Sequence, residues 1–510
     1  MMSVHCREAH LESDHPRLTT TLPLPDALSA EYLEFNRVLP LALEEDRVRV
    51  AAVGVPAGHV LEDLESLFGM PVEIVPVDEA TLADAIRRAC ASAETVVELV
   101  KDLDAEEHGG DGDQPASLAD VRGLASQPPV VRFVNLLIRE AAEAGASDIH
   151  LDATREGLRI RLRVDGVLSD VPAPPGALQA AVVSRLKLLA ELDIAERRLP
   201  QDGRLRVRLE TRELDLRVAT VPSHFGESVT LRLLDRGGRP VGLADLGMAA
   251  DVLQRFAALA GRRHGILLAT GPTGSGKTTT LYAALGLRDT TAEKIVAVED
   301  PVEYELPGVT QIHVNERTGL TFARALRGIL RLDPDVLMVG EMRDEETADI
   351  AVRAAMTGHL VFSTLHTNDA VAAIPRLLDL KVPAYLVAAT IEGILAQRLV
   401  RKTCTECRRR YRPDPQTVAL LAERPVGNVR LERGEGCKAC RHTGYRGRTG
   451  IFELLVFDEQ LKEAVNRGAD RARLRELAGA QGMRTLRQDG WARVEAGITT
   501  IEEVLRVVQV

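Results

Sequence analysis

Aromatic side chains are scarce in this chain, at 3% of its 510 residues with a single Trp. Proteins that hold single-stranded nucleic acid stack successive bases on such side chains. An excess of positive charge is missing too: the formal net charge is -11, whereas nucleic-acid binders concentrate Lys and Arg for phosphate contacts. We therefore expect no nucleic acid among the partners of this protein.

Long apolar runs are also missing. No segment reaches the roughly 18 uninterrupted apolar residues that a spanning helix requires, and the first residues, MMSVHCREAHLESDH, carry charges throughout. The N-terminus is therefore predicted to be neither a signal peptide nor a membrane span. With 45% hydrophobic and 27% charged residues, we expect a soluble cytoplasmic protein whose six cysteines stay reduced.

The length of the chain predicts three or four domains, because one core rarely grows beyond about 250 to 300 residues. EYLEFNRVLPLAL and HVLEDLESLFG have helical spacing, the first running into a strand, and RVRVAAVGV alternates like a strand. DLDAEEHGGDGDQPAS is acidic and poor in apolar residues, which is typical of a flexible linker. The predicted parts are a small N-terminal α/β domain at 1–107, a linker at 108–126, a second domain at 127–240, a third at 241–400, a cysteine-containing lobe at 401–448 and a C-terminal region at 449–510.

The second domain is predicted to contain hairpins. GLRIRLRVDGVL alternates apolar residues with arginines and then reaches an Asp-Gly turn at Asp165 and Gly166, and RLRVRLETRELDLRV repeats the alternation. Most of these arginines are expected to lie on a solvated face. From about Leu243 apolar strands alternate with helices, which is the pattern of a parallel sheet, and from about Gly450 the chain is predicted to be helical.

The most specific signal is GILLATGPTGSGKTTTLYAAL, in which an apolar strand enters GxxxxGK[ST] and a helix follows. Glycines let backbone N–H groups turn towards a β-phosphate, Lys277 reaches the β and γ oxygens, and the Thr278 hydroxyl ligates Mg²⁺. ATP and Mg²⁺ are thus the expected ligands. The predicted phosphate-binding residues are Gly271, Pro272, Thr273, Gly274, Ser275, Gly276, Lys277 and Thr278.

Three further apolar runs end in polar residues of the kind that nucleotide hydrolysis uses. KIVAVEDPVEYE supplies Glu299, Asp300 and Glu303, DVLMVGEMRD supplies Glu341, and GHLVFSTLHTND supplies His366. Because the carboxyl ends of parallel strands meet at one edge of a sheet, these groups should face the phosphate loop. We assign Glu299 and Asp300 to nucleotide binding, and Glu303, Glu341 and His366 to catalysis together with Lys277.

His359 lies seven positions before His366, a separation of roughly 23 Å in a strand, so the two cannot touch one phosphate. His359 is expected to serve packing or a subunit contact. In DVLMVGEMRD, Gly340 closes the apolar run at the position where P-loop proteins generally have an aspartate that holds the metal. Glu341 follows Gly340. Glu341 either activates the attacking water or holds a metal-bound water, and we favour water activation.

Arginines stabilise the charge that develops on a transferred phosphoryl group. The spacing leaves the choice open among Arg204 in QDGRLRV, Arg217 in LDLRVAT, and three arginines of a helical segment, Arg324, Arg327 and Arg331. Surface charge is the alternative explanation for each of them.

These motifs together resemble the secretion ATPases of type II secretion and type IV pilus assembly. The resemblance covers nearly the whole chain and rests on ASDIHLD, RLPQDGR, GPTGSGKTTTLYA, EDPVE, LRLDPDVLMVGEMRD, TGHLVFSTLHTNDA, LAQRLVRKTC and GYRGRTGIFELL, which occur in the family's order. One departure is Leu332, where the family usually has glutamine. Total length and the short N-terminal module favour the type II secretion ATPase over the pilus assembly ATPase, and the cysteine motifs disfavour the pilus retraction ATPase.

The resemblance implies a cytoplasmic homohexamer that is peripherally associated with the inner membrane. Its fold would be an α/β RecA-like P-loop core preceded by a PAS-like α+β domain and by a small N-terminal docking domain that binds inner-membrane platform proteins of the secretion system. It also implies that arginines matching Arg204 and Arg217 lie over the nucleotide. A DNA-uptake or nucleic-acid translocating motor and a regulatory scaffold without turnover are the alternatives.

Cysteines form the last signal. CTEC gives Cys404 and Cys407, GCKAC gives Cys437 and Cys440, and 29 residues separate the two pairs. Two CxxC pairs in a reducing compartment favour four-coordinate Zn²⁺, although this loop is longer than the common 15 to 20 residues. A redox pair and unligated thiols are the alternatives. A site closed by four cysteines has no open position, so we expect the metal to be structural.

Overall fold

The computed structural model describes residues 30–44, 47–90, 96, 99–100, 125, 127–209, 212–235, 241–422 and 429–508. The chain forms two compact units, Met1–Gly112 and Asp113–Val510. Apart from Ala125, the predicted linker at 108–126 lies outside the described residues.

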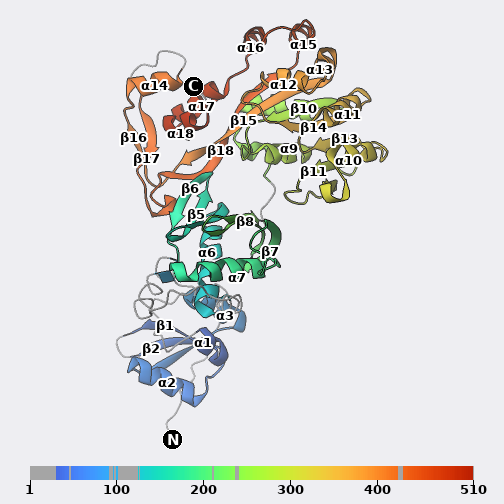
Figure 1. The fold of residues 1–510 in the computed structure, drawn as a ribbon. Coiled ribbons are helices and arrows are strands. Elements are labelled where there is room, and N and C mark those ends of the chain that lie inside the picture. Colours follow the sequence, from blue (N-terminus) through green and yellow to red (C-terminus); the bar gives the residue numbers. More distant parts are fainter. Residues whose placement is uncertain are drawn as a thin grey trace. The chain divides into compact units, whose positions relative to one another are not determined.

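The N-terminal unit is built on a three-stranded sheet in the order β1-β2-β3. Strands β1 (Val38–Leu43) and β2 (Val48–Ala52) are antiparallel, and α2 (Gly58–Phe68) connects β2 to the parallel β3 (Val72–Pro76). Helices α1 (Ala30–Asn36) and α3 (Glu79–Cys90) complete the unit (Figure 1). The helix-strand-strand-helix order that the sequence predicts between residues 30 and 68 is confirmed.

The second unit begins with an antiparallel sheet of six strands, in the order β6-β5-β4-β9-β8-β7. The Asp165-Gly166 hairpin is confirmed, and it joins β5 to β6. The elements are α6 (Pro128–Glu143), β4 (Ala146–Thr154), β5 (Gly157–Val164), β6 (Val167–Val171), α7 (Gln179–Leu189), β7 (Gln201–Leu209), β8 (Arg212–Ser223) and β9 (Gly226–Asp235).

A seven-stranded sheet in the order β12-β11-β13-β14-β10-β15-β18 forms the centre of the second unit. All neighbouring pairs are parallel except β15 with β18. Its strands β10, β11, β13 and β14 are buried along their whole length, as strands covered on both faces are. The strands are β10 (Gly265–Thr270), β11 (Ile295–Glu299), β12 (Val309–His313), β13 (Val336–Val339), β14 (Leu360–Leu365), β15 (Ile391–Thr403) and β18 (Tyr445–Val456).

Helices cover both faces of this sheet, and two apolar clusters lie between them and the strands (Figure 1). The helices of the sheet region are α8 (Ala250–Ala260), α9 (Lys277–Leu285), α10 (Phe322–Ile329), α11 (Glu345–Met356), α12 (Ala373–Asp379) and α13 (Ala384–Thr390). None of the helices in the described part of the chain is both long enough and apolar enough to cross a bilayer.

The expectation of helix from Gly450 onward is wrong for residues 450–456, which belong to β18. Ile451 and Leu455 pack in one apolar cluster, whereas Phe452 and Leu454 pack in the other. Because both faces of β18 are covered, its sequence lacks the apolar-polar alternation by which a half-exposed strand is recognised. The remainder is helical, as α15 (Glu459–Asn466), α16 (Arg471–Ala480), α17 (Leu486–Glu495) and α18 (Ile501–Val507).

Between β15 and β18 the chain makes a small lobe. A two-stranded antiparallel ribbon of β16 (Arg408–Tyr411) and β17 (Leu431–Gly434) forms its base, and α14 (Pro415–Leu421) lies between these strands in sequence. The two bounds predicted for this lobe, at residues 400 and 448, fall inside β15 and β18. These strands belong to the central sheet and also lead into and out of the lobe.

Candidate functional site

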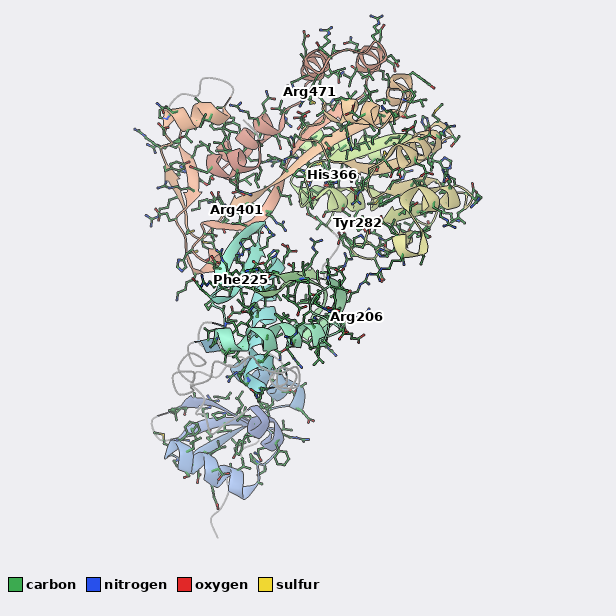
Figure 2. The ribbon with its side chains drawn as sticks, in the orientation of Figure 1. Arg206, Phe225, Tyr282, His366, Arg401 and Arg471 are labelled. Atoms are coloured by element: carbon green, nitrogen blue, oxygen red, sulfur yellow. The ribbon has the colours of Figure 1, made fainter. Side chains whose placement is uncertain are left out.

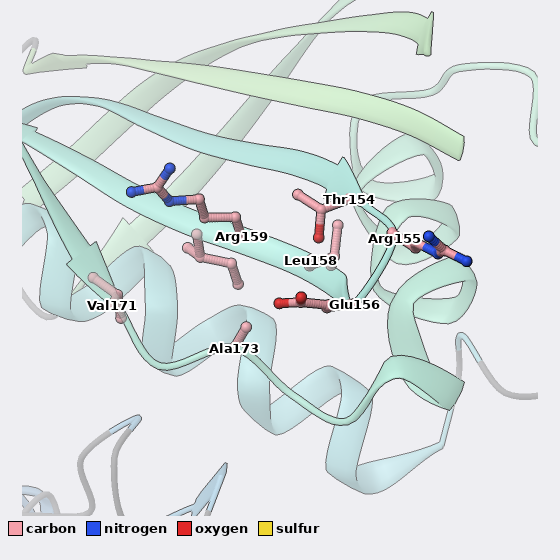
Figure 3. Close-up of a pocket in the computed structure, with 8 residues that line it drawn as sticks. Thr154, Arg155, Glu156, Leu158, Arg159, Val171 and Ala173 are labelled. Carbon is pink, nitrogen blue, oxygen red and sulfur yellow. The ribbon is translucent and has the colours of Figure 1, made fainter. Parts of the chain in front are cut away.

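One pocket in the described part of the chain carries little chemistry. Figure 3 shows a pocket on the second domain at the turn between β4 and β5. Arg159, which projects into it, is already paired with Asp170 at 2.8 Å. None of the predicted site residues lines this pocket, whose lining is Thr154, Arg155, Glu156, Leu158, Arg159, Ile160, Val171 and Ala173.

The phosphate loop lies at the carboxyl end of β10, between this buried strand and the start of α9. Gly276 precedes α9 with a φ of +86°, a conformation that favours glycine. A Cβ at Gly276 would lie 2.8 Å from Nε2 of Gln397, and one at Gly271 would lie 2.6 Å from the Gln397 carbonyl oxygen. The loop therefore needs glycine at both positions because strand β15 packs directly against it.

The loop fits a bound polyphosphate. Its backbone N–H groups and the N-terminus of α9 suit an anion, and the hydroxyl of Ser275 is buried without a hydrogen-bond partner. The ammonium group of Lys277 donates to the carbonyl oxygens of Gly271 and Pro272 at 2.8 and 3.0 Å. The pKa of Lys277 is lowered to about 8, chiefly by burial; Glu341 opposes the shift and the nearby Arg398 adds to it. An arriving phosphate would relieve this unfavourable burial of positive charge.

Glu341 faces the same edge of the sheet, just after β13. One carboxylate oxygen lies 3.0 Å from Nε2 of His366, and the other accepts from Arg343 at 2.5 Å. Burial alone would raise the pKa of Glu341, but the hydrogen bonds and charges of Arg343 and His366 outweigh it, so the pKa is lowered. Glu341 is thus held as a carboxylate within electrostatic reach of Lys277.

The two histidines lie at opposite ends of β14. His366 follows the strand at the edge of the phosphate loop. His359 precedes it and is bonded locally at the end of α11, with Nδ1 2.8 Å from the Ala354 carbonyl oxygen and 3.2 Å from the Thr357 hydroxyl. Packing is therefore the role that the contacts of His359 support.

The EDPVE segment follows β11 at the same edge. Asp300 is exposed, and its charge acts on Arg343. Glu299 is buried; it accepts hydrogen bonds from the Tyr282 hydroxyl and from Gln311, and burial raises its pKa. These contacts support a role for Glu299 in holding the segment, and its assignment to nucleotide binding stays a prediction.

Arginines of the second domain reach this segment. A guanidinium nitrogen of Arg217 donates to the Val302 carbonyl oxygen at 2.9 Å, and the charge of Glu303 acts on it. Arg204 stands opposite Arg217 on β7, and Arg232 stands opposite it on β9. The sheet therefore presents a row of three arginines. Arg232 was not predicted, because the pairing of β8 with β9 is not visible in the sequence.

The arginines of α10 have local partners. Arg324 donates to the Gly319 carbonyl oxygen at 3.3 Å, and Arg327 pairs with Glu346. These contacts favour Arg217 over Arg324 and Arg327 as an arginine that acts on the nucleotide.

Arg398 is a further charged residue at the site that the sequence analysis missed. It lies on β15 next to Gln397, it is 7% exposed, and it donates to the Asn368 carbonyl oxygen at 2.9 Å. Gln397 accepts from the Thr280 hydroxyl of α9 at 2.6 Å. The available signal was an arginine within the apolar run LAQRLV, which places a charge in a buried strand.

The four cysteines of the lobe converge. All four sulfur atoms lie within 4.8 Å of one another. Sγ separations of 3.9 Å for Cys404 with Cys437, 3.8 Å for Cys407 with Cys440 and 3.7 Å for Cys437 with Cys440 match the edge of about 3.8 Å that metal–sulfur bonds of about 2.3 Å give a tetrahedron. The β16-β17 ribbon brings the distant pairs together, since Arg408 stands opposite Gly434. The arrangement is that of a four-thiolate metal site.

Residues 124–506 match the family described as type II/IV secretion system protein, and residues 12–96 match the MshEN domain. A protein named type II secretion system protein E from Xanthomonas campestris is 44% identical over 491 residues, which cover 96% of this chain and 86% of that protein. A type IV pilus assembly ATPase, PilB, from Thermus thermophilus is 41% identical over 501 residues, which cover 97% of this chain and 55% of that protein.

Among solved structures, the pilus retraction motor PilT with bound ADP is similar, with a TM-score of 0.51 and 28% identity over 73% of this chain and 96% of that one. The similarity bears out a RecA-like P-loop core with an α+β domain before it, as the sequence predicts.

Proposed function

The chain belongs to the type II/IV secretion system protein family, and we propose that it is the ATPase that powers pseudopilus assembly and protein export by a type II secretion system. Members of this family are ATP-hydrolysing secretion motors, and this chain is an ATPase. The observation that carries the proposal is the meeting of Lys277 and Glu341 at one edge of the sheet, where the charge of Glu341 acts on Lys277.

Each residue at that edge has a role in the proposed reaction. The loop amides and Lys277 hold the β- and γ-phosphates, and the Thr278 hydroxyl would hold Mg²⁺, which would supply positive charge for the phosphate oxygens. Glu341, ionised and anchored by His366 and Arg343, orients the attacking water and accepts its proton. His366 contacts the γ-phosphate, and the charge of Glu303 acts on Arg217.

Arg217, together with Arg204, supplies positive charge for the transferred phosphoryl group. Support comes from the 2.9 Å bond of Arg217 to Val302, which brings this side chain of the second domain to the EDPVE segment. Arg232 stands in the same row, where it is paired with Asp148 at 3.2 Å and its charge acts on Arg217.

The assembly we propose is a homohexamer on the cytoplasmic face of the inner membrane. The N-terminal unit forms its own compact body, which suits a module that binds a cytoplasmic part of the membrane platform. A hexamer working on such a platform is consistent with the relatives, which are named as secretion and pilus-assembly proteins.

We further propose that the four cysteines bind Zn²⁺. Support comes from the sulfur separations and from backbone N–H groups of Gly436, Cys437 and Gly444, which lie 3.1 to 3.3 Å from cysteine sulfurs and would stabilise thiolates. The ion would cross-link the two ends of the lobe and take no part in hydrolysis.

The experiment is to measure phosphate release from the full-length chain and from Lys277→Ala. We expect turnover by the wild type that is enhanced by its membrane partner, and no turnover by the variant. Full turnover by Lys277→Ala contradicts the proposed mechanism.

Pilus assembly is the second candidate function, favoured by the similarity to PilB along 97% of this chain. The two are separated by expressing the chain in a strain that lacks either its secretion ATPase or its pilus-assembly ATPase. Restored export of secreted proteins supports the first function, and restored pili support the second.

A further inference from the structure

Five consecutive residues after β14 each contact a different part of the second unit. Residues 366–370 carry the sequence HTNDA. Their partners are Glu341 for His366, Thr270 for Thr367, Arg398 for Asn368, Arg471 and Arg475 for Asp369, and Glu453 for Ala370. We call residues 366–370 the junction segment.

The first two residues of the junction segment are tied to the reacting groups. Nε2 of His366 lies 3.0 Å from the carboxylate of Glu341. The Thr367 backbone N–H donates to the Thr270 hydroxyl at 2.9 Å, and the two hydroxyls are 2.7 Å apart. Thr270 is the last residue of β10 before the phosphate loop, so a shift of this segment would act both on Glu341 and on the start of that loop.

The third residue, Asn368, connects the junction segment to Arg398, a buried arginine beside the phosphate loop. Arg398 donates to the Asn368 carbonyl oxygen at 2.9 Å, and its other guanidinium nitrogen would lie 3.0 Å from a Cβ at Gly271. Arg398 therefore packs against the phosphate loop on one side and against the junction segment on the other.

The last two residues tie the segment to the C-terminal helices. Asp369 pairs with Arg471 and, at 3.2 Å, with Arg475, both on α16. The Ala370 backbone N–H donates to Glu453 at 2.8 Å, and the other oxygen of that carboxylate accepts from the backbone of Leu486 at 3.2 Å. Figure 2 shows Arg471 among the C-terminal helices and His366 at the central sheet.

We propose that Asp369 is a positioning residue for hydrolysis, which acts by fixing the junction segment, and with it His366 and Glu341, to helix α16. Asp369 is three residues from His366, so the ion pairs with Arg471 and Arg475 constrain where His366 meets Glu341. Displacements of about 1 Å in such contacts cost large factors in rate. The position of α16 consequently sets the rate of hydrolysis, and a partner that moves α16 would change that rate.

The test uses the full-length protein and the variants Asp369→Asn and Arg471→Gln/Arg475→Gln. Asparagine keeps an oxygen that accepts from the Ala372 backbone, as Asp369 does at 2.7 Å, and removes only the charge. The matched control is Arg473→Gln, because Arg473 lies on the same helix and pairs with Glu476. Two partly exposed ion pairs predict a kcat about three- to tenfold lower in both test variants, with KM for ATP changed by less than about twofold.

Amide hydrogen exchange provides a second measurement that does not depend on turnover. We expect faster exchange of residues 367–372 in both test variants and unchanged exchange in Arg473→Gln. Unchanged kcat and unchanged exchange in both test variants would overturn the inference, as would equal effects in the control or a loss expressed only in KM.

The kinetic part rests on the proposed ATPase function. A wild-type protein without turnover contradicts that function, and the exchange experiment then still decides whether Asp369 and α16 fix the junction segment.

Discussion

Oε2 of Glu341 lies 3.0 Å from Nε2 of His366, although the two residues are 25 positions apart in the chain. The register of the central sheet produces this contact, because β13 and β14 pair in parallel and their carboxyl ends are adjacent. Glu341 thereby has a partner that orients it before any nucleotide arrives.

Glu341→Gln removes the proton acceptor and keeps the size of the side chain. We expect kcat to fall by about 10²- to 10⁴-fold, because general bases contribute this much, while ATP binding stays close to wild type. Phosphate release and equilibrium nucleotide binding measure the two effects. Glu345→Gln, at an exposed position at the start of α11, is the control, and equal losses in the two variants would contradict the role of Glu341.

Nucleotide affinity should depend on pH through Lys277. Its pKa of about 8 lies below the ordinary value of 10.5, so the free protein loses the proton as the pH rises through about 8. Phosphate binding favours the charged form, so binding takes up a proton above this pH. The affinity for ATP is therefore expected to be full below pH 8 and to fall between pH 8 and 10.

Calorimetric titration in two buffers with different ionisation enthalpies measures that proton uptake. Lys277→Arg is the control, because guanidinium keeps its charge throughout this range and its affinity should show no such slope. A wild-type affinity that is flat from pH 7 to 10 would show that the burial of Lys277 has no such effect.

Arg217→Ala should lower kcat by about 10²- to 10³-fold. This loss is smaller than the loss expected when one arginine alone stabilises the transferred phosphoryl group, because Arg204 and Arg232 remain in the same row. Steady-state phosphate release measures the loss. Arg206→Ala is the matched control, since Arg206 is 77% exposed on β7. If the control lost as much activity, the effect would belong to the sheet and not to Arg217.

Cys404→Ser should abolish stoichiometric zinc and lower the Tm by at least about 5 °C, because the ion cross-links the lobe and its binding is coupled to folding. Elemental analysis and thermal unfolding measure the two effects. Cys90→Ser, in the N-terminal unit, is the control and should keep both. A wild-type protein purified without metal would contradict the assignment.

Local patterns predicted much of this architecture. The phosphate loop, the four strands that supply Lys277, Glu341, His366 and the EDPVE segment, and the convergence of the cysteine pairs follow from short motifs. Contacts across the sequence did not follow. Arg232 reaches the row of arginines through strand pairing, and Arg398 lies in β15, whose place beside β10 depends on the order of the whole sheet.

The burial of a charged residue in strand β18 could not be predicted from local sequence either. Glu453 is the one charged residue in the apolar run IFELLV, and glutamate is seldom fully buried unless it is paired. In the structure it is buried, and the backbone N–H groups of Ala370 and Leu486 satisfy its oxygens. Neither donor is near Glu453 in sequence, so no local pattern predicts that a carboxylate can be buried at this position.

The cysteine lobe leaves the central sheet and returns to it at neighbouring points, since Thr403 of β15 stands opposite Tyr445 of β18. Residues 404–444 thus amount to an extended hairpin connection, whose ends are already held at the spacing that a short turn spans. A tight turn in place of the lobe would keep the register of the two strands. It would also remove Val418, Leu421 and Leu431 from the larger apolar cluster, so the lobe contributes part of the core of the second unit as well as a cysteine site.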